Sequence, residues 1–211
     1  MTAKVRYIPH DTNPACLYKL VAGLVVPRPI ALVSTIDRNG RPNLAPFSWF
    51  NALATDPPYL GISVGQHPND RPKDTLNNVL ATGEFVVNVV GTSIAAQQDI
   101  CAHAYAADVD EFQASGLTPV PATLVRPPCV AESKAWFECK LVHTLPLPRS
   151  SYTLIIGEVI AIHVDADIVN ECRIDMKALD VVGRLAGPEY CRLNDTFSLE
   201  HDSFNHTGLR P

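Results

Sequence analysis

The sequence predicts a mainly β fold with a few appended helices, and three observations support this. The chain of 211 residues is 46% hydrophobic and 18% charged, below the about 25% charge of an average protein, which is typical of a well-buried globular chain. Eighteen prolines separate many short apolar segments, and proline favours strand ends, edges and turns because it donates no backbone hydrogen bond. No fixed repeat or low-complexity linker divides the chain. We therefore expect a single domain over residues 1–211, built on a small closed antiparallel sheet.

The first elements are a helix and a hairpin. Apolar residues at helical spacing predict a helix over 14–24, and Pro14 suits its first turn. The β-branched run 29–36 predicts a strand. Asn39-Gly40 then forms a strong turn signal, which predicts a hairpin into a second strand over 44–53.

The next elements are a strand and a capped helix. The segment 59–64 has the composition of a strand, and 73–82 that of a helix. We expect Asp74 or Thr75 to be the N-cap of this helix, and Gly83 to follow its last residue.

The second half of the chain returns to strands after a helical stretch. Its pattern predicts, in order, a strand over 84–90, helices over 93–106 and 110–115, and long strands over 136–144 and 152–164. Gly157 inside the last strand indicates a bulge or a close approach of the backbone. The polar tail 201–211 predicts a loose end or a contact at a dimer edge.

Charge and motif spacing exclude several classes of function. Seventeen Lys and Arg against 22 Asp and Glu give a net charge of −5, so nucleic acid and anionic membranes are poor partners. The longest apolar stretches, such as 20–26, are shorter than the ~20 residues of a membrane span. No signal-peptide core precedes them, and we expect a cytoplasmic protein. Seven histidines and six cysteines lack the spacing of a zinc site, so we expect no metal.

One motif of catalytic enzymes is present. Residues 61–65 read G-I-S-V-G and match the G-x-S-x-G of serine hydrolases, in which a helix starts directly behind the serine. The following residues contain two prolines and no helical pattern before Lys73, so Ser63 reads as part of a strand. A serine hydrolase using Ser63, with His143 or His163 as partner, is therefore a remote alternative.

The start of the predicted helix at Lys73 has the features of an anion site. A helix N-terminus presents free backbone N–H groups and the positive end of the helix dipole. Lys73 adds a charge, Thr75 a hydroxyl group and Arg71 a planar guanidinium that suits phosphate. The alternative is a simple surface helix in which Asp74 or Thr75 is only the cap.

The segment 43–51 is unusual for a plain strand. Pro42 and Pro46 free part of an extended backbone from ladder pairing, and this backbone could face the edge of a flat ligand. The polar and aromatic side chains available there are Asn43, Ser48, Asn51, Phe47 and Trp49. An edge strand with a bulge is the alternative. A phosphate anchor together with this segment would suit flavin mononucleotide (FMN), although the residues alone do not choose the ligand.

A family resemblance extends this interpretation. In order along the chain stand P-R-P-I-A-L-V-S-T from Pro27, N-L-A-P-F-S-W-F-N from Asn43, D-P-P from Asp56, K-D-T-L-N-N from Lys73 and E-F-V-V-N from Glu84. The blocks I-I-G-E-V-I-A-I-H-V over 155–164 and V-G-R-L-A-G-P-E-Y over 182–190 continue the likeness. Together they resemble the flavin reductase-like family of FMN-binding split barrels, over roughly residues 10–200.

The resemblance implies a fold, an assembly and a site. The expected fold is a six-stranded, Greek-key-like split β-barrel that forms a homodimer, with FMN near the interface. Carried over by motif position, residues expected beside the flavin are Ser34, Thr35, Asn43, Ala45, Phe47, Ser48 and Asn51. Residues expected around the phosphate and ribityl chain are Arg28, Arg71, Lys73, Asp74 and Thr75, with Asp74 orienting the loop through its cap. Less specific candidates near the flavin or the dimer seam are Arg184 and Tyr190.

The resemblance also implies an activity, with one departure. Reductases of this family use NADH or NADPH to reduce a small-molecule acceptor through bound FMN, and some supply reduced flavin to a partner monooxygenase. Many carry G-D-H before the last long strand, where this chain has Ser150-Ser151-Tyr152. Tyr152 either takes the place of that histidine or is an ordinary strand aromatic. A non-catalytic FMN carrier or sensor is therefore the alternative to an oxidoreductase.

Overall fold

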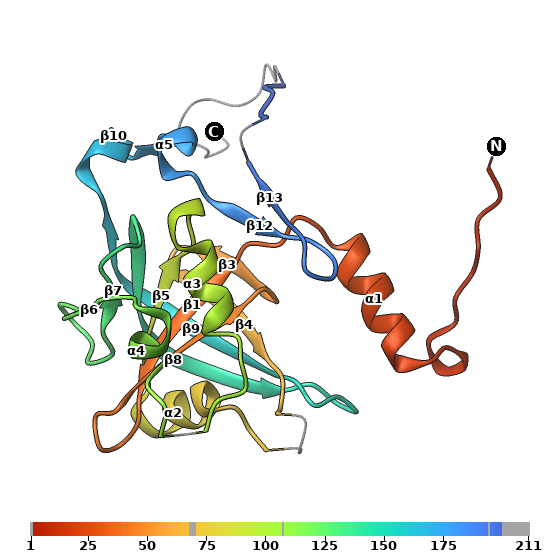
Figure 1. Cartoon of the computed structure of the whole chain (residues 1–211), viewed down its shortest axis with the longest axis horizontal. Coiled ribbons are helices and arrows are strands. Elements are labelled where there is room, and N and C mark those ends of the chain that lie inside the picture. The colour runs from red at the N-terminus through yellow and green to blue at the C-terminus, as the bar shows by residue number, and fades with distance from the viewer. Residues whose placement is uncertain (1, 68–70, 107, 194, 200–211) are drawn as a thin grey trace.

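The computed structural model describes residues 2–67, 71–106, 108–193 and 195–199, and its body is one antiparallel sheet (Figure 1). Seven strands follow one another in the order β2-β1-β5-β8-β9-β4-β3. Their bounds are β1 (Ala31–Ile36), β2 (Pro42–Phe47), β3 (Phe50–Thr55), β4 (Pro58–Val64), β5 (Glu84–Val89), β8 (Ala135–Pro146) and β9 (Thr153–Val164). The predicted mainly β architecture is confirmed.

The sheet closes on itself because its two edges are consecutive in the chain. Only Ser48 and Trp49 separate β2, at one edge, from β3, at the other. At this junction the backbone N–H of Ser63 in β4 donates to the Trp49 carbonyl oxygen at 2.8 Å. The prediction of one strand over 44–53 is therefore wrong, and the sheet has seven strands where six were expected.

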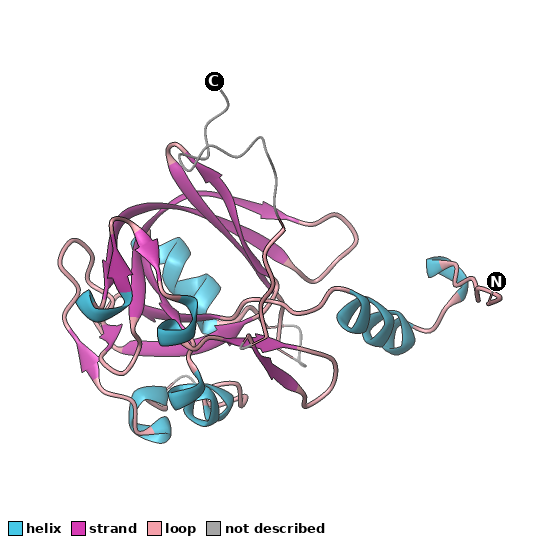
Figure 2. Cartoon of the chain, turned by 90° about the horizontal axis from the view of Figure 1, so that it is seen from above, coloured by secondary structure: helices cyan, strands magenta, loops and turns pink. Residues whose placement is uncertain are grey.

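Helices and short strands surround the barrel. The helices are α1 (Pro14–Leu24), α2 (Asp74–Thr82), α3 (Ala95–Ile100), α4 (Glu111–Ser115) and α5 (Met176–Leu179), with 3₁₀ turns η1 (Pro9–Asp11), η2 (Thr92–Ile94) and η3 (Ala166–Ile168). The short strands are β6 (Pro119–Val120), β7 (Cys129–Val130), β10 (Val169–Asn170), β11 (Arg173–Ile174), β12 (Val182–Arg184) and β13 (Tyr190–Arg192). Of the residues in α1 only Ala22 is buried, and the helix stands apart from the sheet in both views (Figures 1 and 2).

The barrel interior holds the main core. Phe85 and Val33 are fully buried there, and α2 contributes Val79 to the same cluster. A Cβ atom on Gly157 would overlap the Phe85 ring, so a side chain at this position would clash with the core. The predicted close approach at Gly157 is confirmed.

A second apolar cluster fixes the helices that flank β2. Phe112 of α4 and Ile94 pack with Leu32 and Leu44, which are buried on the side of the sheet away from the barrel interior. Val182 of β12 joins the same cluster. This packing holds α3, α4 and β12 close to one edge strand of the sheet.

The helix predictions are confirmed in part. The helix over 14–24 is present, as is one starting at Asp74 and ending before Gly83, whose φ of 71° is the left-handed C-cap expected of glycine. The N-cap of α2 is Lys73 and no side chain caps it, so the assignment of Asp74 or Thr75 is wrong. The helix predicted over 93–106 ends at Ile100. The tail 201–211 lies outside the described residues.

The described helices are all too short or too polar to cross a lipid bilayer.

Candidate functional site

Two adjoining cavities run along β2 and share Pro46 and Ala102 as walls. The first, of about 110 Å³, is lined by Asn43, Ala45, Lys73, Asp74, Thr75 and Glu111, among others. The second, of about 170 Å³, is lined by Phe47, Ser48, Asp99, Arg184 and Tyr190, among others. We call the two together the β2 groove. It joins the start of α2 to the β12–β13 hairpin.

Positive charge and free N–H groups gather at the α2 end of the groove. Lys73 is the N-cap, and its carbonyl oxygen accepts the first helical bonds, from Leu76 and Asn77. The hydrogen bonds of the described residues leave the amides of Asp74 and Thr75 without an acceptor. Burial lowers the pKa of Lys73, whose Nζ lies 5.3 Å from the centre of the Phe47 ring. This end suits an anion.

A buried polar cluster behind the groove holds β1, β2 and α2 together. Asn43 Nδ2 donates to Thr75 Oγ1 at 3.1 Å and to Thr35 Oγ1 at 3.3 Å. Asn78 Nδ2 donates to Thr35 Oγ1 at 3.0 Å. Thr35 is completely buried, so it fixes the orientation of Asn43 from behind.

The other end of the groove is built by the β12–β13 hairpin. The Arg184 guanidinium carbon lies 4.4 Å from the centre of the Tyr190 ring. Tyr190 accepts a hydrogen bond from Gln98 Nε2 at 2.8 Å and donates one to Asp99 Oδ1 at 3.1 Å. Arg184 Nη2 donates to the Gly187 carbonyl oxygen, whereas Nη1 is buried without a partner among the described residues. A buried donor without an acceptor is costly.

A buried carboxylate lines the cavity at the α2 end of the groove. Glu111 is the first residue of α4, and its Oε2 accepts from the backbone N–H of Leu44 at 3.1 Å. Burial raises the pKa of Glu111. The sequence analysis missed Glu111, because only the packing of α4 against β2 brings it to the groove.

The structure brings most of the predicted site residues together. Those that line the β2 groove are Asn43, Ala45, Phe47, Ser48, Lys73, Asp74, Thr75, Arg184 and Tyr190. Two others are buried inside the fold: Thr35 lies behind Asn43, and the Ser34 hydroxyl donates to the Pro128 carbonyl oxygen. Neither Ser34 nor Thr35 lines the groove.

Arg28, expected at the phosphate, is placed elsewhere. Its guanidinium donates to the carbonyl oxygens of Ala22, Val25 and Leu185, and its Nε donates to Ser48 Oγ at 3.3 Å. Because these donors are occupied by the chain itself, Arg28 anchors the segment that leads into β1 and supports Ser48 from behind.

Three further candidates also lie outside the groove lining. Asn51 is exposed on β3, and its side chain accepts from the Ala52 amide. Arg71 is exposed next to undescribed residues. Tyr152 packs on Gly65, where a Cβ atom would lie 3.1 Å from its ring, so it does not occupy the groove as a histidine substitute.

Ser63 does not form a nucleophile elbow. It lies within β4, paired with Leu154 of β9, and no helix follows among the described residues until Asp74. His163, one of its suggested partners, binds Glu138 at 2.7 Å. The geometry that a serine hydrolase requires is therefore not formed at Ser63.

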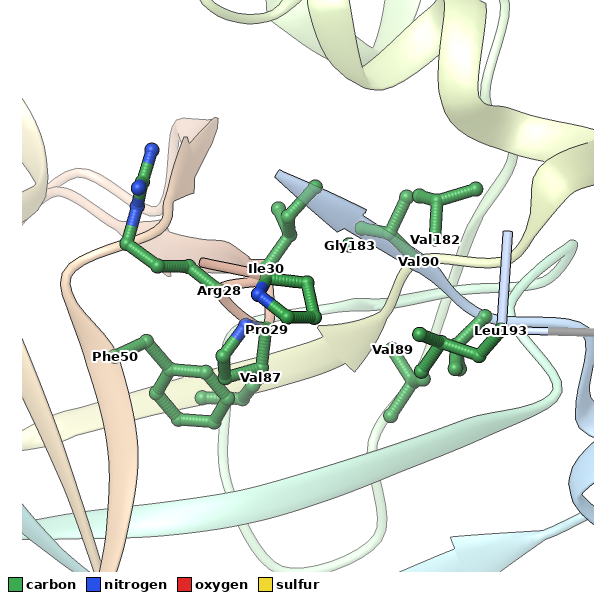
Figure 3. Close-up of a pocket in the computed structure, with 12 residues that line it drawn as sticks. Arg28, Pro29, Ile30, Phe50, Val87, Val89, Val90, Val182, Gly183 and Leu193 are labelled. Carbon is green, nitrogen blue, oxygen red and sulfur yellow. The ribbon is translucent and has the colours of Figure 1, made fainter. Parts of the chain in front are cut away.

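A third cavity, which the sequence analysis did not predict, is apolar (Figure 3). It has a volume of about 250 Å³, and its walls include Ile30, Phe50, Val87, Val182 and Leu193. Arg28 lies at its border with the guanidinium directed away from these side chains (Figure 3). With such a lining the cavity does not suit a phosphate-bearing ligand.

Residues 23–178 match the family model of the flavin reductase like domain. The chain belongs to the flavin reductase-like family. It is 40% identical over 189 residues to an uncharacterized protein of Aquifex aeolicus, covering 89% of this chain and 95% of that protein. This membership confirms the resemblance in the sequence motifs.

Solved structures agree with this assignment. Nitrilotriacetate monooxygenase component B from Bacillus cereus superposes with a TM-score of 0.91 at 32% identity, covering 94% of this chain and 100% of that one. A protein with a split barrel domain from Shewanella frigidimarina superposes with a TM-score of 0.80 at 28% identity. The match covers 91% of this chain and 95% of that one. The predicted split-barrel fold is confirmed.

Proposed function

We propose that this chain is a cytoplasmic, FMN-dependent oxidoreductase that takes electrons from NADH or NADPH and reduces free flavin or another small acceptor. The observation that carries the proposal is the β2 groove of a flavin reductase-like chain. One end of the groove has Lys73 and free helix amides, and the other has an unpartnered Arg184 donor beside an edge strand.

The α2 end of the groove fits the phosphate of FMN. Lys73 Nζ and the amides of Asp74 and Thr75 supply a positive charge and two backbone donors, which is the usual composition of a phosphate site at a helix N-terminus. Within the described residues no carboxylate lies within 4.0 Å of Lys73 Nζ, so its charge is available to a ligand.

The rest of the groove fits the flavin ring. Ala45, Pro46 and Phe47 present a strand edge and apolar walls, and Ser48 is held in place by Arg28. Arg184 adds a half-buried positive charge, which would stabilise negative charge on a ring beside it. Bound FMN would supply the hydride and electron transfer chemistry, and the protein would supply binding, orientation and electrostatics.

We also propose that the chain acts as a homodimer. Helix α1 exposes Tyr18 and Leu24, with 59% and 80% of their surface accessible, and Leu53 of β3 is 49% accessible. Apolar surface of this extent on a projecting helix is typical of a protein interface. In light scattering we expect twice the 23.0 kDa chain mass, and Leu24→Glu should shift the mass toward the monomer. A monomeric wild type would contradict the proposed dimer.

A monooxygenase partner fits the same proposal. One solved structure similar to this chain is a component of a monooxygenase, and a reductase of this type would supply reduced flavin to such a partner. A non-catalytic FMN carrier is the second candidate, because Tyr152 does not enter the groove. The two candidates differ in whether a nicotinamide reduces the bound flavin.

A visible absorption spectrum tests the proposal. The purified protein is loaded with FMN, freed of excess ligand, and mixed anaerobically with NADH or NADPH. Flavin bands that bleach within seconds would support the oxidoreductase. Bands that persist would support the carrier, and a folded protein that retains no FMN would contradict both.

A further inference from the structure

Glu111 is a buried acid that has no assigned role in the proposed flavin site. Only 9% of its surface is accessible, yet it lines the β2 groove. It also lines a neighbouring cavity of about 80 Å³, together with Asp37, Asn43 and Asn78. A carboxylate in this position is desolvated, and burial raises its pKa.

The hydrogen bonds of Glu111 occupy only one of its two oxygen atoms. Oε2 accepts from the Leu44 backbone N–H at 3.1 Å. Among the described residues no donor lies within hydrogen-bond distance of Oε1, and this atom is absent from the fully enclosed polar atoms of the fold. A carboxylate oxygen can accept more than one hydrogen bond, so Oε1 has the capacity to accept from a ligand in the cavity that Glu111 lines.

The position of Glu111 along the groove identifies the part of a ligand that it would meet. Leu44, its partner, lies between Asn43, which binds Thr75 at the α2 end, and Ala45, which leads toward Phe47 and Ser48. Glu111 therefore lines the same cavity as the end suited to the phosphate, and the lining of the second cavity, which suits the ring, does not include it. In FMN the ribityl chain, with its three hydroxyl groups, joins these two parts.

The charges around Glu111 oppose direct contact between its carboxylate and an anionic group, although Lys73 lines the same cavity. Asp110 and Asp74 each raise the pKa of Glu111 in addition to its burial. A negatively charged group would add to this repulsion, whereas a hydroxyl group would donate the missing hydrogen bond. Hydrogen bonds to charged groups are the stronger ones.

We propose that Glu111 accepts a hydrogen bond from a ribityl hydroxyl and gives the β2 groove its preference for flavins that carry this chain. The proposal rests on flavin binding in the groove. It differs from a purely structural role, in which Glu111 only holds β2 against α4 through the Leu44 amide.

The variant Glu111→Gln separates these two roles. The amide oxygen of Gln still accepts from the Leu44 N–H, so β2 stays in place, but the charged acceptor is lost. Glu132→Gln is the matched control, because the Glu132 carboxylate also accepts a backbone N–H, from Thr118, at an exposed position outside the groove.

The experiment measures dissociation constants for FMN, riboflavin and lumiflavin by flavin fluorescence. Lumiflavin has the same ring system and lacks the ribityl chain. We expect Glu111→Gln to weaken FMN and riboflavin by about fivefold to tenfold, the difference between a charged and a neutral acceptor. Lumiflavin should change by less than about twofold, as should all three ligands with Glu132→Gln.

Two results would overturn the role of Glu111 while leaving the proposed function intact. Equal weakening of all three ligands would show that Glu111 acts only through the position of β2. Unchanged affinities in a folded Glu111→Gln variant would show that the ligand does not contact it. A wild-type protein that binds none of the three would instead overturn the flavin site itself, and this inference with it.

Discussion

Two buried carboxylates of this chain, Glu138 and Glu111, differ in how many hydrogen bonds they accept and in the direction of their pKa shift. Glu138 in β8 is fully buried and accepts from the Thr123, Leu124 and Val125 amides, from the Thr123 hydroxyl and from His163. Glu111 has a single donor among the described residues. Burial raises the pKa of both, but the hydrogen bonds to Glu138 outweigh it and lower its pKa to about 2, whereas that of Glu111 stays raised.

The difference separates a group that holds the fold from one that is available to a ligand. The donors of Glu138 fasten the segment 123–125 to the barrel, and they leave the Glu138 carboxylate little capacity for another contact. Along the β2 groove, Glu111 and Arg184 retain unused hydrogen-bonding capacity, as do the first amides of α2. Buried polar groups are normally satisfied, so a cluster that is not satisfied indicates a binding site.

The largest expected effect is on folding. Glu138→Ala removes a charge on which several buried donors converge, and we expect it to lower the free energy of unfolding by about 3–5 kcal/mol. Urea unfolding measures this. Glu132→Ala, at an exposed position, should stay within about 0.5 kcal/mol of the wild type. If Glu138→Ala lowered the free energy of unfolding as little as Glu132→Ala does, Glu138 would not be a group that holds the fold.

Protonation of Glu138 should make the folded protein less stable at low pH. Its pKa is lowered from 4.5 to about 2 by folding, so the folded state binds fewer protons than the unfolded state in this range. The resulting stability, about 3 kcal/mol, is present above pH 4.5 and is lost as the pH falls toward 2. Urea midpoints measured between pH 6 and 2 should fall steeply for the wild type. The midpoints should fall less for Glu138→Gln. If the midpoints of the variant and the wild type fell equally with pH, Glu138 would not be the source of this pH dependence.

At the groove, Lys73→Ala should weaken FMN binding by about tenfold to hundredfold, because it removes the charge that we propose to face the phosphate. Adding Arg71→Ala tests whether that exposed guanidinium also contributes. Stability should change little, since Lys73 is already partly desolvated. Fluorescence titration with FMN and riboflavin distinguishes a phosphate contact from a general effect. Lys140→Ala, on the exposed side of β8, is the control, and an equal loss of both flavins would place the phosphate elsewhere.

The smallest expected effect belongs to Ser63. Because it is paired within β4, Ser63→Ala should leave flavin affinity unchanged and should not alter any cleavage of a chromogenic ester. A loss of ester cleavage in this variant would reopen the hydrolase alternative.

The sequence predicted the parts of the site that are local in the chain. The helix N-terminus at Lys73 and the unusual segment around Pro46 could be recognised because each depends on neighbouring residues. The split at Ser48 and Trp49 could not, because β2 pairs back onto β1 whereas β3 pairs forward onto β4, and the strand-like composition of the segment does not mark where one hairpin ends and the next begins.

Long-range packing explains the residues that the sequence analysis missed or misplaced. Glu111 reaches the groove only because α4 packs on β2, 67 positions from Leu44. Arg28 lies in a conspicuous motif, but its donors are taken up by carbonyl oxygens as distant as that of Leu185. The family likeness assigned Arg28 to the phosphate and did not identify Glu111, and only the three-dimensional contacts show which of the two lines the groove.

The most direct test of the account is a map of backbone amide shifts in ¹H–¹⁵N spectra recorded with and without FMN. Binding of FMN in the β2 groove should shift the amides of Ala45, Ser48, Thr75 and Arg184, and should leave Leu124, beside Glu138, unshifted. Shifts centred on Val87 and Val182 at the apolar cavity, or no shifts at all in the folded protein, would contradict it.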